Sequence, residues 1–151
     1  MKVLGIAVRV SNMRSTTSLV LLEGTKGSEV GAVVLDALQV TGGDTDWATH
    51  VGNIAQAVRG HVQSICPDAV IVRRADQAPH ARNSDGPKVR LLIEGGVVAV
   101  CMDVTAEVRI RSGKECGKAL STTKDDLEDR AESLVDRRFA EAAAAALSAL
   151  G

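Results

Sequence analysis

The chain has 151 residues, of which 45% are hydrophobic and 25% are charged, a composition typical of one globular domain and not of a disordered segment. Its 18 basic and 19 acidic residues give a formal net charge of -1. The total charge therefore does not support nonspecific electrostatic binding of a polyanion. Only 1% of the residues are aromatic, which leaves few flat side chains to stack on an exposed nucleobase.

The cysteines and the apolar segments bear on the compartment. Cys66, Cys101 and Cys116 are far apart and in no Cys-x-x-Cys spacing, which favours buried or incidental thiols in a reducing environment. No leader-like pattern precedes the first apolar segment, and no apolar run approaches the ~18 residues of a membrane span. We therefore expect a cytoplasmic protein with no membrane partner.

Three strands are expected at the start of the chain. Residues 3–8 form an apolar run suited to a strand buried on both faces. Residues 16–23 and 29–40 supply the second and third strands, after polar turns at 9–15 and 24–27. Short connections between consecutive strands predict an antiparallel meander.

An amphipathic helix is expected over residues 44–66, with Asp44 and Asp46 as capping residues at its start. Apolar residues recur there at steps of three and four, which predicts one buried stripe: Trp47, Val51, Ile54, Ala55, Val58, Val62 and Ile65. Pro67 and Asp68 end this helix, and residues 69–72 read as a fourth strand.

The segment 88–103 is ambiguous. It fits a hairpin that turns at Gly95 and Gly96, which its periodicity slightly favours, or a helix that each glycine weakens by about 1 kcal/mol. A fifth strand is expected at 107–110. Two helices are expected after it, the second rich in alanine: 123–135 and 136–150.

This order of elements predicts the fold class. Strands that alternate with helices imply parallel strands joined by right-handed crossovers, added here to an antiparallel meander. We therefore expect a single α/β domain over residues 1–151 with a ribonuclease H-like, five-stranded mixed sheet. Strands one to three should be antiparallel, strands four and five parallel, and helices should flank the sheet.

Several segments, in this order and spacing, carry a resemblance to a known family: Gly5 to Asn12, Pro67 to Arg73, Arg82 to Ser84, Gly96 to Ala99, Lys114 to Leu120 and Arg138 to Ala142. Over nearly its whole length the chain resembles the RuvC family of Holliday-junction resolvases. Members of that family open with Gly-Ile-Asp and a turn that ends in Ser-Asn, and their fourth strand ends in Glu. The resemblance implies a helix over 88–102, in place of the hairpin that the local pattern favours.

The resemblance also implies a site that has lost its acids. These nucleases hold two Mg²⁺ ions roughly 4 Å apart with four carboxylates, because hard divalent cations need oxygen ligands. The matching positions here are Ala7, Arg73, Arg138 and Glu141, and only Glu141 could still ligate a metal. Their formal charge changes from -4 in the family to about +1 here. We therefore expect no catalytic residues, no bound metal and no cofactor.

Two interpretations of the arginines stay open. Arg73 and Arg138 could form a buried ion-pair cluster with Glu141 that replaces the metals as the structural centre. Alternatively, arginines could bind phosphate directly through their guanidinium forks. The residues expected to contact nucleic acid in that case are Arg9, Arg73, Arg74, Arg82 and Lys88.

The leading functional hypothesis is a catalytically inactive RuvC-like domain that acts as a binding module for structured DNA or RNA, or for a protein partner. Because RuvC-type resolvases are dimers, the resemblance also implies a homodimer, which we expect to form through the 44–66 helix. The alternative is a metal-dependent, structure-specific endonuclease with a rearranged acid set around Glu141 and either Asp36 or Asp76, which would require Mg²⁺. A third possibility is a structural subunit with no affinity for nucleic acid.

Overall fold

The computed structural model describes residues 1–76 and 84–151. The predicted phosphate contact Arg82, together with Pro79, His80 and Asn83, lies outside the described residues. Among the described residues, no helix is both long enough and apolar enough to cross a membrane.

The sheet has five strands in the order β3-β2-β1-β4-β5. β1 pairs with β2 and β2 with β3 in antiparallel fashion, whereas β1 with β4 and β4 with β5 are parallel. This topology confirms the predicted ribonuclease H-like sheet. The strands are β1 (Lys2–Ser11), β2 (Arg14–Thr25), β3 (Ser28–Gly42), β4 (Ala69–Arg73) and β5 (Val108–Arg111).

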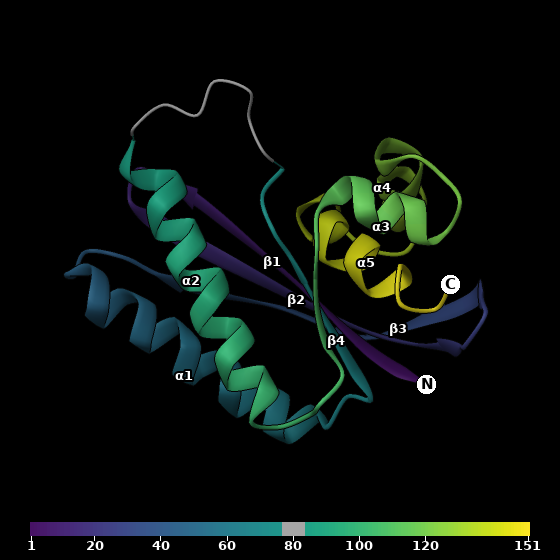
Figure 1. Ribbon diagram of the computed structural model, residues 1–151, viewed down its shortest axis with the longest axis horizontal. Helices are drawn as coiled ribbons and strands as arrows, with labels where there is room; N and C mark the ends of the chain where they lie inside the picture. The colour runs from purple at the N-terminus through teal and green to yellow at the C-terminus, as the bar shows by residue number, and fades with distance from the viewer. Residues whose placement is uncertain (77–83) are drawn as a thin grey trace.

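Helices cover both faces of the sheet (Figure 1). Two long helices lie on one face, and a group of shorter helices lies on the other (Figure 1). The long helices are α1 (Trp47–Ile65) and α2 (Asp85–Met102). The short ones are α3 (Gly113–Ala119), α4 (Lys124–Glu132), the 3₁₀ turn η1 (Arg137–Phe139) and α5 (Ala140–Leu147).

The short helix α5 packs unusually close to the sheet because both surfaces are built from small residues. A Cβ atom at Gly5 of β1 would lie 1.8 Å from the carbonyl oxygen of Ala142, so only glycine fits there. All but one of the α5 residues are buried, and six of its eight positions are alanine. This close contact explains how a core with a single buried phenylalanine, Phe139, still packs without aromatic bulk.

The local preference for a hairpin over residues 88–103 is wrong, because this segment is the helix α2. Its buried apolar residues Val89, Ile93, Val97 and Cys101 follow a strict step of four, which places them on one helix face against the sheet. Gly96 lies on the side that meets α1, where a Cβ atom would be 3.3 Å from Val51. Of the two glycines that suggested a turn, Gly96 therefore serves the packing of α2 on α1, whereas a Cβ atom at Gly95 would meet nothing within 4 Å.

Three further boundaries differ from the sequence expectation. The predicted turn at 9–15 shrinks to Asn12 and Met13, both with positive φ (50° and 59°), because β1 and β2 pair almost to the hairpin tip. Helix α3 was expected only as a Lys-rich turn, although Ser112 and Glu115 form a capping box at its start. The predicted helix 136–150 begins as a 3₁₀ turn and becomes α-helical at Ala140.

Candidate functional site

The four positions that the family resemblance singles out converge at one end of the sheet. Ala7 of β1 and Arg73 of β4 are direct partners in the parallel register. Ala7 also lines a pocket together with Arg138 and Glu141, which lie at the start of the C-terminal helical segment. The charge of Glu141 in turn acts on Arg73. The predicted juxtaposition of these positions is therefore present.

Arg73 is the buried centre of this region, with only 2% of its side chain exposed. Its Nη1 and Nη2 atoms each donate to Oε1 of Glu128 at 3.1 Å, and Nη2 also donates to Oδ2 of Asp76 at 3.3 Å. Burial alone would lower the pKa of this guanidinium, but the charges of Glu141, Glu128 and Asp76 raise it above its ordinary value. Arg73 is thus a buried, permanently charged guanidinium that is surrounded by carboxylates.

This burial corrects one predicted contact. Arg73 was expected to bind phosphate, but its guanidinium faces inward and is already held by two acids, so it is not accessible to a polyanion. Its Nε atom is buried and has no hydrogen-bond partner within residues 1–76 and 84–151. Arg73 therefore lies in a buried ion-pair cluster, but its partners are Glu128 and Asp76, whereas the sequence predicted a cluster with Arg138 and Glu141.

Asp76 joins the end of β4 to the helices above it. Its Oδ2 atom accepts from Nζ of Lys124 at 2.9 Å and its Oδ1 atom from the backbone N–H of Gly113 at 3.0 Å. Burial acts to raise the pKa of Asp76, but the hydrogen bond from Lys124 and the charge of Arg73 outweigh it and hold the pKa below 3.8. With three donors already bound, this carboxylate is occupied as a structural acceptor.

A rearranged metal site is therefore not assembled in the described part of the chain. Asp76 is engaged by protein donors, and Asp36 lies exposed on the edge strand β3, opposite Leu21. Across the described ranges, no group of three or more His, Cys, Asp or Glu side chains is placed to hold a metal ion. Glu141 instead forms an ion pair with Arg9, whose Nη2 atom lies 3.5 Å from Oε1.

A second buried acid fixes the chain where it leaves β4. Glu94 of α2 accepts from Nε of Arg90 at 2.9 Å and from the backbone N–H of Ala75 at 3.2 Å. Burial raises the pKa of Glu94 against the opposing charge of Arg90. This contact holds Ala75, which follows Arg74, to α2 on one face of the sheet. The next residue, Asp76, is held to α3 and α4 on the other face, so the segment after β4 is anchored on both sides.

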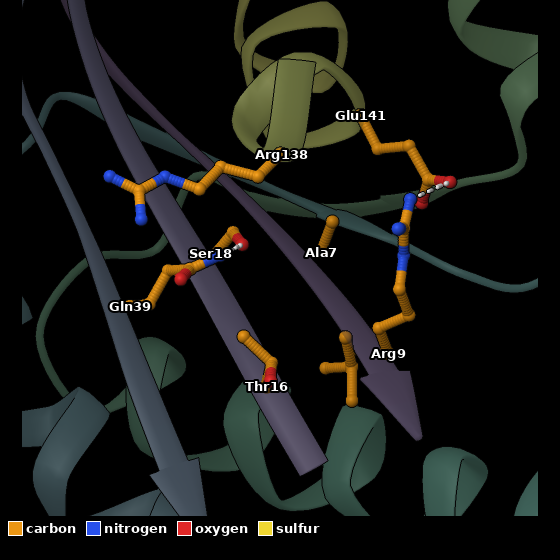
Figure 2. A pocket seen from close by; sticks show the side chains of 8 residues that line it. Ala7, Arg9, Thr16, Ser18, Gln39, Arg138 and Glu141 are labelled. Carbon is orange, nitrogen blue, oxygen red and sulfur yellow. Dashed lines mark hydrogen bonds and ion pairs between the residues drawn. The ribbon is translucent and has the colours of Figure 1, made fainter. Parts of the chain in front are cut away.

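The pocket at this end of the sheet has a volume of about 230 Å³ and is open to solvent. Its floor is the face of the sheet that α5 leaves uncovered, where Ala7, Ser18 and Gln39 are consecutive partners on β1, β2 and β3. Figure 2 shows Arg138 extending over Ser18 and Gln39 on one side, while Arg9 pairs with Glu141 on the other. The arginines thus flank a floor of uncharged polar side chains.

The other predicted phosphate contacts in the described part of the chain, Arg9, Arg74 and Lys88, are accessible. Arg9 and Arg74 have 69% and 43% of their side chains exposed, and Lys88 is exposed near the start of α2. Arg74 forms an ion pair with Glu115 at 3.4 Å. The Cζ atom of Arg138 lies 4.8 Å from the centroid of the Phe139 ring, and its Nε atom lies 3.8 Å from Oδ1 of Asp136.

The whole region is charge-balanced. The sequence predicted a net charge of about +1 for the four matching positions alone. In the structure, five cations face five acids, which leaves no formal net charge. The cations are Arg9, Arg73, Arg74, Lys124 and Arg138, and the acids are Asp76, Glu115, Glu128, Asp136 and Glu141.

Sequence reasoning missed five residues of this region: Thr16, Ser18, Gln39, Lys124 and Glu128. A signal for the first pair was present, because Thr16 and Ser18 continue the face of β2 that is apolar at Val20 and Leu22. A switch from apolar to polar residues along one strand face marks the point where the covering helix ends. Glu128 carried no such signal, since it lies in an acidic helix that is explained equally well as a solvated surface.

Comparison with known proteins agrees with this fold. The sequence matches no protein-family model and no curated protein. Among solved structures, the chain has the ribonuclease H-like fold of RuvC-type Holliday-junction resolvases. Thermus thermophilus RuvC is 20% identical with a TM-score of 0.71, and the match covers 98% of this chain and 92% of that one.

Two further structures are similar. Thermus thermophilus RuvC in complex with Holliday junction substrate has 18% identity and a TM-score of 0.70 over 98% of this chain and 91% of that chain. The yeast mitochondrial Holliday junction resolvase has 10% identity and a TM-score of 0.59 over 98% of this chain and 77% of that chain. At these identities the comparison establishes the fold.

Proposed function

We propose that this chain is a RuvC-fold domain without nuclease activity that acts by binding a structured nucleic acid. The observation that carries the proposal is the pair Ala7 and Arg73, which stand opposite each other where the family resemblance requires carboxylates. A methyl group provides no metal ligand, and a sealed guanidinium repels a divalent cation. In this proposal, fixed arginine side chains replace part of the positive charge that magnesium ions would supply in a nuclease.

Binding is supported by the exposed cations around this end of the sheet and by the solved complex of a RuvC of the same fold with a Holliday junction. Arg9 and Arg74 form exposed ion pairs at 3.5 and 3.4 Å, which contribute roughly 0–1 kcal/mol each. A phosphate can replace such a carboxylate partner and gain a bidentate contact. Because the region is charge-balanced, we expect few phosphate contacts and moderate affinity.

The test is a gel shift with a four-way DNA junction and a linear duplex of the same sequence, at several salt concentrations. We expect binding that weakens as salt rises, because each displaced counterion contributes to the slope. Arg9→Ala, Arg74→Ala and Lys88→Ala should each weaken binding, while Arg59→Ala, which removes a cation from α1 on the other face of the sheet, should not. No shift, or a shift independent of salt, would favour the structural-subunit hypothesis.

Incubation of the junction with the protein and Mg²⁺ or Mn²⁺ tests the loss of catalysis. We expect no cleavage product with either metal. Tight calorimetric binding of either ion that Glu141→Ala abolishes, together with cleavage, would establish the alternative, a nuclease with a rearranged acid set.

We also propose a homodimer, but through α2 and not through the 44–66 helix. The outward residues of α1 are mostly polar and therefore a poor dimer surface: Asn53, Gln56, Arg59, Gln63 and Ser64. On α2, by contrast, Leu91, Leu92 and Met102 are 68%, 48% and 58% exposed. Apolar side chains so exposed on one helix favour an interface.

The pattern along α2 suits a second copy of this chain. Gly95 lies at the middle of the exposed stripe, and no atom lies within 4 Å of a Cβ built on it, so another backbone could approach closely. In an antiparallel pair of α2 helices, Lys88 at one end would approach Asp103 at the other end of the partner. A twofold interface of this kind is self-complementary.

A further inference from the structure

We propose that the pocket between Arg9 and Arg138 recognises a ribose phosphate, so that the preferred ligand is an RNA strand and not DNA. This inference rests on the binding function proposed above and names the ligand class of the same region. It is carried by the hydrogen bond between Ser18 and Gln39 on the pocket floor. These two residues belong neither to the metal-site positions nor to the predicted phosphate contacts.

The floor presents a matched donor and acceptor. Nε2 of Gln39 donates to Oγ of Ser18 at 3.1 Å (Figure 2). Within the described part of the chain, this bond leaves the hydroxyl proton of Ser18 and the Oε1 atom of Gln39 without a protein partner. A ligand hydroxyl group can accept from the first and donate to the second. The pair is therefore complementary to an alcohol.

The two sides of the pocket each carry an arginine that could bind a phosphate next to the ligand hydroxyl group. Arg138 reaches over Ser18 and Gln39 from η1, and Arg9 lies at the opposite side next to Glu141 (Figure 2). Each guanidinium can donate two parallel hydrogen bonds to phosphate oxygens. A hydroxyl group that lies between phosphates is the repeating feature of the RNA backbone, because DNA lacks the 2′-hydroxyl.

The size and chemistry of the pocket exclude some other ligands. Its volume of about 230 Å³ corresponds to roughly eight water molecules, which suffices for a sugar with a phosphate. No aromatic residue lines it, so stacking on a base is not the recognition mode. A ligand without the hydroxyl would cover Ser18 and Gln39 and leave their polar groups unpaired, which is unfavourable.

The experiment compares a 20-nucleotide RNA with the DNA of the same sequence by fluorescence anisotropy. We expect the RNA to bind at least tenfold more tightly. A 2′-O-methyl version of the RNA should bind like the DNA, because its oxygen no longer donates to Gln39. Ser18→Ala and Gln39→Ala should each abolish the difference between the RNA and DNA affinities, because they remove both the contact with the 2′-hydroxyl and the polar groups that DNA leaves unpaired. Ser64→Ala and Gln56→Ala, on the outer side of α1, are the matched controls.

The outcomes separate this inference from the proposed function. Equal affinity for RNA and DNA that neither pocket variant changes would overturn the inference while leaving nucleic-acid binding intact. If neither oligonucleotide binds and the four-way junction gives no gel shift either, the proposed function fails, and NMR titration with AMP and dAMP decides the inference. Shifts at the Ser18 amide and the Gln39 side chain with AMP but not with dAMP would support a free ribonucleotide as the ligand. No shift with either nucleotide would overturn the inference.

Discussion

Gly113 packs so tightly against Arg73 that a Cβ atom at position 113 would lie 2.2 Å from Nη2 of Arg73 and 2.7 Å from its Cζ. Because Arg73 is buried and held by Glu128 and Asp76, its guanidinium has little room to move. We expect Gly113→Ala to lower the free energy of unfolding by about 1–3 kcal/mol through overpacking. Gly60→Ala on α1, where a Cβ atom meets nothing within 4 Å, should stabilise the protein by about 0.5–1 kcal/mol. Urea unfolding of both variants gives the comparison, and a neutral Gly113→Ala would show that the guanidinium is loosely held.

Arg73→Met should destabilise the domain more severely. The methionine fills a similar volume but leaves the carboxylates of Glu128 and Asp76 without their buried cation. Loss of one partner from such a buried cluster costs about 3–5 kcal/mol. Arg109→Met is the control, since Arg109 is 62% exposed and pairs with Glu107 at 3.8 Å, where the loss is about 0–1 kcal/mol. Similar unfolding free energies for the two variants would contradict the buried-cation interpretation.

The stability of the domain should fall in acid partly through Asp76. Its pKa is lower in the folded state than the ordinary 3.8, so its ionised form stabilises the fold above that pH. This contribution is lost as the pH falls through the lowered folded pKa. We therefore expect the difference in unfolding free energy between the protein and Asp76→Asn to be large at pH 7 and to shrink below about pH 4. Asp129→Asn, at an exposed acid on α4, should give a small difference that changes little over this range.

The proposed dimer predicts a change in oligomeric state from one exposed side chain. Leu91, at 68% exposed, lies on the apolar stripe of α2, so Leu91→Lys places a charge in the proposed interface without touching the core. We expect the dimer dissociation constant to rise at least tenfold, about 1.4 kcal/mol, in analytical ultracentrifugation. Gln63→Lys on α1 adds the same charge outside that interface and should leave the dimer unchanged. A dimer that Gln63→Lys disrupts and Leu91→Lys does not would restore the predicted 44–66 interface.

The fold was predictable from the sequence because the spacing of apolar residues is clear in most strands and helices. The continuous apolar run from Val3 to Val8 is a strand buried on both faces, and the steps of three and four along α1 correspond to one buried face of that helix. The exception is α2, where the exposed Leu91 and Leu92 add apolar residues on the side opposite the core. With apolar residues on both sides, the helical period disappears and the segment resembles a hairpin. The same residues that hid the helix are those that suggest its interface.

The site was only partly predictable. The convergence of Ala7, Arg73, Arg138 and Glu141 at one end of the sheet followed from the motifs that carry the family resemblance. The net charge around these positions could not be predicted from the sequence, because Glu128 and Lys124 lie on α4, more than 50 residues from Arg73 along the chain. Long-range ion pairs leave no periodic pattern in a sequence. The same holds for the pocket floor, where register between β2 and β3 joins Ser18 to Gln39.

If these four positions are equivalent to the acid positions of the resolvases, restoring the acids should restore a metal site. The variant Ala7→Asp, Arg73→Glu, Arg138→Asp gathers carboxylates around Glu141, so without metal their repulsion should destabilise the fold. Magnesium at 100 times its dissociation constant would return about 2.7 kcal/mol, which raises Tm by roughly 5–10 °C in a domain of this size. The unsubstituted chain should show no such shift.

The matched control for this variant moves one acid to the edge strand β5. Ala7→Asp, Arg73→Glu, Arg109→Asp has the same net charge, but its third carboxylate lies beyond the ligand set. We expect a smaller magnesium response from it in differential scanning calorimetry, because a divalent cation needs several oxygens around one point and not a general negative charge. Equal responses from the two variants would mean that Arg138 does not occupy a ligand position. The proposed loss of catalysis would then need another explanation.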